Sequence, residues 1–159
     1  MRRLRDGEWI AGAGGVALLA SMFLHWYRLD LPSPAGGLDD PFAPEATAWQ
    51  AFGVLDVVLA LLALVPLALV VTQATRKSPA IPVFFSVMTV LAGALAALLI
   101  LYRIVNQPGE NQFVEVQVGA WLGFLAALVI GAGGWRSTRV EAVPGDPPRP
   151  IEEQPLPAP

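Results

Sequence analysis

Four long apolar runs constrain the fold more than any other feature of this sequence. They cover residues 9–27, 49–71, 81–102 and 118–135, so each has between 18 and 23 residues. A helix needs about 20 residues to cross roughly 30 Å of hydrocarbon. Inside lipid every backbone N–H and C=O group must be paired within the protein, which favours helices over strands with open edges. The sequence therefore predicts an all-α membrane protein, an antiparallel bundle of four transmembrane helices.

The composition agrees with a lipid environment. Hydrophobic residues make up 55% of the chain and charged residues 14%, against roughly 45 to 50% and about 25% in soluble domains. The alternative for the first run is a cleaved signal peptide, because "MRRLR" resembles a basic n-region. That run is long, ends in the bulky "HWYR" and has no clear small-x-small site directly after it. These features favour a retained helix over a cleaved leader.

The cations predict the orientation. Both termini and the connection between the second and third runs carry eight of the ten: Arg2, Arg3, Arg5, Arg76, Lys77, Arg136, Arg139 and Arg149. Because Lys and Arg are retained in the cytoplasm, we expect a multi-pass protein of the plasma membrane with both termini cytoplasmic. Residues 1–8 are then a basic cytoplasmic N-terminus and 9–136 the membrane domain. Residues 137–159 are a Pro-rich tail, predicted to be disordered because they cannot bury a core.

Two phrases occur twice in the same order. "YRL" at Tyr27–Leu29 and "YRI" at Tyr102–Ile104 each close an apolar run, and "AWQAF" at Ala48–Phe52 and "AWLGF" at Ala120–Phe124 follow about twenty residues later. One interpretation is a duplicated helical hairpin, which would give two repeats about an axis along the membrane normal. The other is convergence, since any membrane hairpin places Tyr, Trp and Arg at its rims. The residues leave both open.

Small residues predict how the helices pack. Membrane helices associate through close packing, which small side chains allow. The fourth run carries them at four-residue spacing, at Gly119, Gly123, Ala127 and Gly131, and the first run at Ala13, Ala17 and Ser21. We expect these two ridges to face each other. A homodimer through the same ridge, or a contact with another membrane protein, is also compatible with the pattern.

A few polar side chains fall within the predicted outer layer of the membrane. Asp56 is seven residues past Trp49, so about 10 Å below the outer aromatic belt in a continuous helix. Arg103, His25 and Gln117 fall at the same level. The structural interpretation is an Asp56–Arg103 pair that fixes helix register, and the functional one is a proton- or cation-responsive site at Asp56.

The remaining chemistry limits the function classes. The chain has no Cys and a single His, which excludes thiolate and multi-histidine metal sites. A net charge of −3 gives no basic surface for nucleic acid. We find no phosphate loop, nucleophile elbow or HExxH motif, so we expect no enzymatic activity, no catalytic residue, no metal and no cofactor. The partners expected are the lipid bilayer and membrane proteins.

The runs "GEWIAGAGGVALLASMFLHWY", "AWQAFGVLDVVLALLAL" and "GAWLGFLAALVIGAGGW" resemble those of small uncharacterised four-span integral membrane proteins of high-GC, actinobacterial-type bacteria. The resemblance covers residues 8–136 and implies topology alone, with no functional motif. Small multidrug transporters also have four spans, but their working carboxylate is a Glu in the first span, which has no acid here. The function predicted is a non-enzymatic scaffold or accessory subunit. The alternative is a small transporter or channel-like component centred on Asp56.

Overall fold

The computed structural model describes residues 6–29, 44–75, 83–108 and 114–142, which form five helices and three short strands. In chain order the elements are α1 (Asp6–Ser21), β1 (His25–Leu29), β2 (Glu45–Thr47), α2 (Ala48–Ala51), α3 (Val54–Thr75), α4 (Val83–Val105), β3 (Val114–Val116) and α5 (Val118–Ala142). The described part of the chain is therefore mainly helical, with one small sheet.

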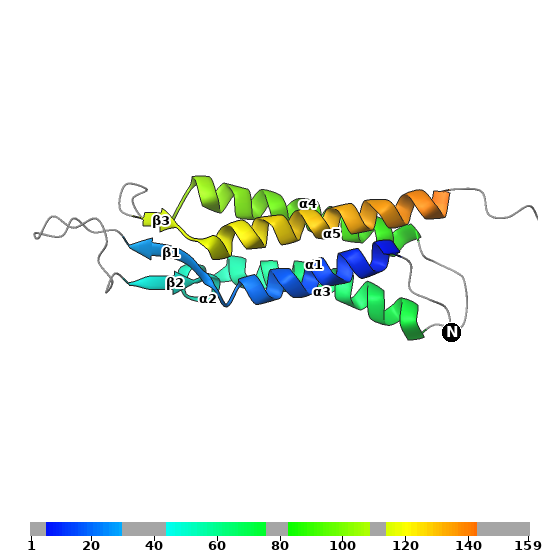
Figure 1. Ribbon diagram of the computed structural model, residues 1–159, viewed down its shortest axis with the longest axis horizontal. Helices are drawn as coiled ribbons and strands as arrows, with labels where there is room; N and C mark the ends of the chain where they lie inside the picture. Colours follow the sequence, from blue (N-terminus) through cyan, green and yellow to red (C-terminus); the bar gives the residue numbers. More distant parts are fainter. Residues whose placement is uncertain (1–5, 30–43, 76–82, 109–113, 143–159) are drawn as a thin grey trace, which may run out of the picture.

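The four longer helices lie side by side and alternate in direction (Figure 1). Each packs against two neighbours, in the ring order α1, α5, α4, α3. The strands and α2 gather at one end of the helices, which we call the sheet end (Figure 1). At the opposite end, which we call the terminal end, α1 begins at Asp6 and α5 finishes at Ala142.

Among the described residues, three helices are long and apolar enough to cross a membrane. The qualifying stretches are Val54–Thr72 in α3, Phe85–Val105 in α4 and Val118–Arg139 in α5. The first predicted span differs, because α1 has 16 residues and ends at Ser21. Its predicted continuation to Tyr27 is wrong, and the physical reason lies in the buried Trp26. The Trp26 indole N–H donates a 2.7 Å hydrogen bond to the Ser21 carbonyl, a group that a continuing helix would use itself.

The second predicted span is interrupted near its start. Thr47 precedes the short α2, and its backbone N–H donates to the Gln50 side-chain oxygen over 3.0 Å, as in a capping box. Phe52 then adopts an extended conformation, with φ −117° and ψ 151°. The long helix α3 begins only at Val54. The predicted run from residue 49 is therefore a short helix, a break and a long helix.

The sheet joins the two segments that connect the helices at the sheet end. β1 is the central strand, with β2 and β3 antiparallel to it on either side. In this register Arg28 lies directly across from Glu45 on β2 and from Glu115 on β3. The sheet was absent from the sequence-based prediction, which placed His25, Trp26 and Tyr27 in the first helix. Strand β3 does carry a local signal, the strict apolar–polar alternation "VEVQV" at residues 114–118.

Glycines bring α1 and α5 into close contact. A Cβ added at Gly14 would lie 2.9 Å from the backbone N of Ile130, and one at Gly133 would lie 2.5 Å from the backbone N of Ala11. Side chains at these positions would push the backbones apart. The predicted packing of the first helix on the last is therefore present, and it depends on the absence of side chains.

The residues predicted on the α1 side of this contact are mostly wrong. Ala13 and Ala17 are exposed, and only Ser21 is buried. Because α1 directs Gly14 and Ala11 toward α5, the face that carries Ala13 and Ala17 lies on the outside of the ring.

The predicted ridge on α5 is divided between two neighbours. A Cβ at Gly119 would lie 2.6 Å from the carbonyl oxygen of His25 and 2.7 Å from the Trp26 ring, and one at Gly123 would lie 2.8 Å from the same ring. These glycines therefore make room for strand β1 rather than for another helix. Further along, a Cβ at Gly93 of α4 would collide with the backbone of Gly131 and lie 2.9 Å from the carbonyl oxygen of Ala127. The ridge therefore serves β1 at one end and α4 at the other.

The repeated motifs adopt different backbone conformations. Tyr27 lies in strand β1, whereas Tyr102 lies in helix α4. Ala48 and Ala120 are both buried, and the tryptophans that follow them, Trp49 and Trp121, are both exposed. The two Ala-Trp pairs therefore have the same pattern of burial, with Ala buried and Trp exposed. The two Tyr-Arg pairs differ, because one lies in a strand and the other in a helix.

The predicted tail boundary at residue 137 is wrong. Helix α5 continues through Ala142, and Ser137 is buried at the point where α1 passes, 2.5 Å from a Cβ added at Gly7. This packing explains why the helix extends beyond the apolar run. The predicted basic N-terminus at residues 1–8 is divided, because residues 6–8 belong to the first turn of α1. Residues 1–5 and the tail from residue 143 lie outside the described residues.

Candidate functional site

The four polar residues predicted to share one outer layer do not form a single cluster. Within the described part of the chain, no hydrogen bond or ion pair joins any two of Asp56, Arg103, His25 and Gln117. Each has a different environment. The predicted Asp56–Arg103 pair is therefore not formed.

Asp56 lies in the first turn of α3, because that helix begins at Val54 rather than at Trp49. It is buried, and one carboxylate oxygen accepts a 2.7 Å hydrogen bond from the backbone N–H of Val57. The first N–H groups of a helix lack intrahelical partners, and a carboxylate there interacts favourably with the helix dipole. The carboxylate of Asp56 is thus placed to stabilise the start of α3.

Arg103 faces an aromatic ring instead of an acid. Its guanidinium carbon lies 4.5 Å from the ring centre of Phe52, the residue at the break between α2 and α3. Its Nε is buried without a hydrogen-bond partner among the described residues. The cation–π contact connects the end of α4 to the start of α3, the two helices between which the ion pair was predicted.

Phe52 is the centre of a buried cluster that we call the aromatic joint, formed by Trp26, Tyr27, Phe52 and Arg103. The ring of Phe52 makes edge-on contacts with Trp26 and with Tyr27, with centroid separations of 5.5 and 5.8 Å. Such arrangements are favourable beyond the area they bury. The joint connects the sheet to α3 and α4.

Burial has an electrostatic consequence within the aromatic joint. Removal from water raises the pKa of the Tyr27 hydroxyl to about 12, although the nearby positive charge of Arg103 acts in the opposite direction. Desolvation therefore outweighs the attraction of the arginine. Tyr27 stays protonated at neutral pH and acts as a hydrogen-bond donor.

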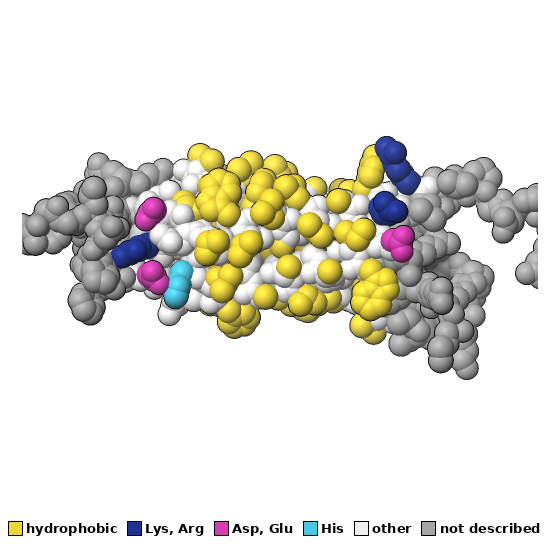
Figure 2. Space-filling model, viewed as in Figure 1, with side chains coloured by type: hydrophobic (Ala, Val, Ile, Leu, Met, Phe, Trp, Pro, Cys, Tyr) yellow, Lys and Arg dark blue, Asp and Glu magenta, His cyan; other side chains and the backbone are white. Residues whose placement is uncertain are grey.

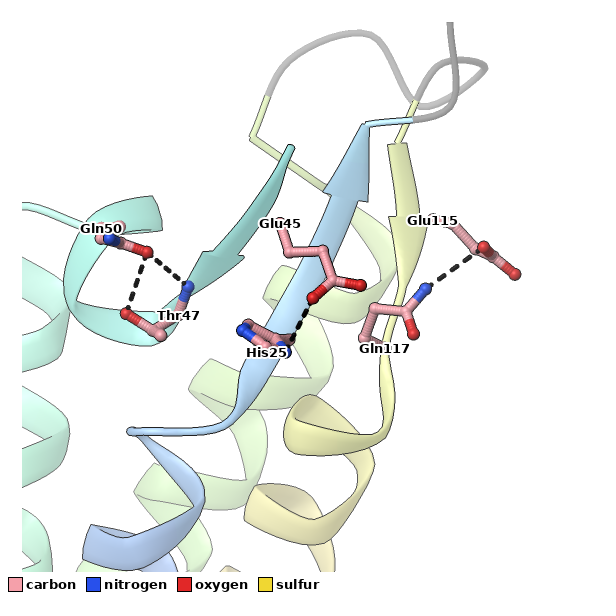
Figure 3. Close-up of polar contacts among 6 residues, drawn as sticks. All are labelled: His25, Glu45, Thr47, Gln50, Glu115 and Gln117. Atoms are coloured by element: carbon pink, nitrogen blue, oxygen red, sulfur yellow. Dashed lines mark hydrogen bonds and ion pairs between the residues drawn. The ribbon is translucent and has the colours of Figure 1, made fainter. Parts of the chain in front are cut away.

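Of the other two predicted residues, His25 lies in β1 and Gln117 directly follows β3 (Figure 3). His25 Nδ1 is 2.9 Å from a carboxylate oxygen of Glu45, across β1 and β2. The Gln117 side-chain nitrogen donates to Glu115 over 3.2 Å. Both pairs are solvent-exposed or partly so, unlike Asp56. These contacts stabilise the sheet locally and bring no group toward Asp56.

The sheet presents charged side chains of both signs. Arg28 stands between Glu45 and Glu115 in the strand register, and His25 lies near the start of the same strand. Opposite charges on directly facing residues stabilise antiparallel strands. We call Arg28, Glu45, Glu115 and His25 the charged sheet face. The sequence did not predict this face, because its residues come from three separate strands and no local pattern shows how those strands pair.

Figure 2 shows hydrophobic side chains along the middle of the helices on one face of the molecule, between two ends that carry charged side chains, and we call this surface the apolar band. Large hydrophobic side chains are exposed on all four long helices, among them Val16 on α1, Leu61 and Leu64 on α3, Leu91, Leu95 and Leu98 on α4, and Leu122, Leu125 and Leu128 on α5. Exposed apolar surface of this extent marks contact with lipid or with other proteins.

Among the described residues, no group of three or more His, Asp or Glu side chains is placed to hold a metal ion. The residues of the aromatic joint offer one hydroxyl donor and one cation, both engaged in contacts between elements. These groups therefore connect β1 and the α2–α3 break to the end of α4.

No protein-family model matches this chain, and no curated protein matches it either.

Proposed function

We propose that this chain is an integral membrane protein that crosses the bilayer four times and presents the sheet end as a rigid outer cap for a protein partner. The observation that carries the membrane part is the band of exposed Leu, Val and Ile side chains between charged ends (Figure 2). Exposure of such a band to water would be unfavourable in free energy, whereas contact with acyl chains is not.

Helix α1 is the fourth crossing in this proposal. Its 16 residues extend about 24 Å, somewhat less than the roughly 30 Å of a hydrocarbon core. Phe23 and Leu24, in the turn that follows, are exposed and extend the apolar surface toward the sheet. The positive-inside rule supports a cytoplasmic terminal end, because eight of the ten Lys and Arg residues fall in the two terminal segments and in the connection between the second and third apolar runs of the sequence.

The topology can be tested with single cysteines, because the natural sequence has none. Glu115→Cys on β3 and Asp6→Cys at the start of α1 are matched probes, since both residues are exposed acids at opposite ends. A membrane-impermeant maleimide applied to intact cells should label the first and not the second. The reverse pattern would overturn the orientation, and release of the protein by alkaline washing of membranes would overturn membrane insertion.

The scaffolding role is supported by the construction of the cap. Segments from both connections at the sheet end are paired in one sheet, and the aromatic joint holds that sheet on α3 and α4. The charged sheet face is held on a rigid support, so little conformational entropy is lost when it binds a partner. The proposed activity is therefore non-enzymatic, a scaffold or accessory subunit.

Reversal of one charge tests the partner contact. Arg28→Glu places a third acid between Glu45 and Glu115 and should abolish co-purification of any stoichiometric partner in mild detergent. Arg139→Gln, at the other end of the molecule, should retain it. A partner that stays bound to Arg28→Glu, or a wild-type protein that purifies without one, would contradict the role assigned to the cap.

A transporter centred on Asp56 is the weaker candidate. The carboxylate accepts a hydrogen bond from the first turn of its own helix, which favours a role in starting α3. Below it, the buried face of α3 consists of Leu59, Ala63, Pro66 and Leu69, which offer no polar side chain for an ion to follow.

A further inference from the structure

A stacked pair of side chains stands at the terminal end of α5. The guanidinium carbon of Arg139 lies 5.1 Å from the ring centre of Trp135, and both side chains are exposed. They are four residues apart, so they are neighbours on one helix face. A guanidinium that lies over a ring keeps the N–H groups at its edge available for an oxyanion.

Among the side chains that the structure describes, no acid is ion-paired with Arg139. The nearby Arg136 is 3.8 Å from the carboxylate of Asp6, and both of these side chains are mostly exposed. This contact is long and solvated, so it leaves most of the positive charge of Arg136 uncompensated. Two arginines therefore lie at the edge of the apolar band (Figure 2).

The exposed face of α5 continues from Trp135 into the apolar band. Leu128 and Leu125 precede Trp135 by seven and ten residues, so they lie on the same side of the helix, and both are about half exposed. Trp9 on the neighbouring α1 is also exposed at this end. Along the axis of α5 the guanidinium group of Arg139 is thus followed by the indole of Trp135 and then by apolar side chains. A phospholipid has the same order, from its phosphate through the interfacial region to its acyl chains.

We propose that Arg139 and Trp135, assisted by Arg136, bind the phosphate group of an anionic phospholipid whose acyl chains lie along Leu128 and Leu125. Charge complementarity favours a lipid with net negative charge, because Asp6 is already in contact with Arg136 and Glu8 is buried and engaged. Glu141 follows Arg139 by two residues, so the two do not share a face of α5. This inference rests on the proposed membrane insertion.

Native mass spectrometry of the full chain in detergent tests it, by titration with phosphatidylglycerol and with phosphatidylcholine of the same acyl chains. We expect wild type to bind phosphatidylglycerol more tightly, and Arg139→Gln to weaken that binding about fivefold. Trp135→Phe keeps a ring under Arg139 and should retain most of the affinity, whereas Trp135→Leu should not. Arg28→Gln, on β1, is the control with the same change in charge.

Three results would overturn the site. They are unchanged phosphatidylglycerol binding by Arg139→Gln, an equal loss with Arg28→Gln, or no preference of wild type for the anionic lipid. Full competition by inorganic phosphate would assign the site to a free anion and overturn the lipid. Because these variants should all stay in the membrane fraction after alkaline washing, failure of the lipid site is distinguishable from failure of membrane insertion.

Discussion

The Tyr27 hydroxyl donates a 3.0 Å hydrogen bond to the carbonyl oxygen of Arg103. This oxygen belongs to the last turn of α4, where carbonyl groups have no intrahelical partner. A strand near the N-terminus therefore completes a helix end that is 76 residues away in sequence. Together with Phe52, which lies between these residues, it fixes the sheet to the helices.

Tyr27→Phe should lower the free energy of unfolding by about 1 kcal/mol, because it leaves the Arg103 carbonyl without its donor while keeping the ring contact with Phe52. Thermal unfolding in detergent measures this. Tyr102→Phe is the matched control, since its hydroxyl accepts a hydrogen bond from Asn106 in an exposed position. Equal effects of the two substitutions would contradict the structural role of Tyr27.

Alkaline pH should destabilise the protein through the same residue. The pKa of Tyr27 is raised to about 12, whereas an unfolded chain releases this proton near 10. Below pH 10 the hydroxyl is neutral in both states, and stability does not change through this group. Between pH 10 and 12 the unfolded chain ionises while the buried hydroxyl does not, so the free energy of unfolding falls by about 2 to 3 kcal/mol. In Tyr27→Phe the loss over this interval should be smaller by that amount. If the free energy of unfolding fell equally with pH in wild type and in Tyr27→Phe, the assignment to Tyr27 would be refuted.

Apolar composition predicts the helices well where it is uninterrupted. Helices α3, α4 and α5 coincide with the central parts of the predicted runs, although α3 begins five residues late and α5 continues seven residues further. A chain segment without polar side chains has few other ways to satisfy its backbone in lipid. The first run fails at its end. Trp26 and Tyr27 are aromatic residues that fit either a membrane helix or a strand. Hydropathy alone does not show that they lie in strand β1 and pack against Phe52.

The candidate site was predicted less well for a related reason. Asp56 and Arg103 were placed together by assuming unbroken helices, but a break at Phe52 puts Asp56 in the first turn of α3 and presents the Phe52 ring to Arg103. The pairing of β1 with β3 joins segments almost ninety residues apart, a contact that local patterns do not contain. Local signals did exist, in "VEVQV" and in the Thr47–Gln50 capping box, but they identify elements rather than partners.

Two glycines of α5 should respond oppositely to the same substitution. A Cβ at Gly123 would lie 2.8 Å from the Trp26 ring, whereas one at Gly131 meets nothing within 4 Å. Gly123→Ala should lower the free energy of unfolding by about 1 to 3 kcal/mol through overpacking. Gly131→Ala should raise it by about 0.5 to 1 kcal/mol through helix propensity. Melting curves in one detergent provide the comparison, and a stabilised Gly123→Ala would show that Trp26 is not held there.

The face that α1 presents to α5 can be tested in the same way. Gly14→Ala would bring a methyl group within 2.9 Å of the Ile130 backbone, which cannot yield easily, and should lower the free energy of unfolding by about 1 to 3 kcal/mol. Ala17→Leu adds three carbons on an exposed position and should change it by no more than about 0.5 kcal/mol. A larger loss for Ala17→Leu would restore the packing face predicted from the small-residue spacing.

The separation of Asp56 from Arg103 gives the most decisive test of the site. A double-mutant cycle with Asp56→Ala and Arg103→Ala measures their coupling directly, because effects of residues that share no contact add. Asp56→Ala should lower the free energy of unfolding by about 1 kcal/mol through loss of the Val57 N–H contact. Arg103→Ala should act through its stacking on Phe52. We expect a coupling energy below about 0.5 kcal/mol. A buried ion pair broken by either change would instead couple by several kcal/mol, since each single substitution would leave the other charge uncompensated.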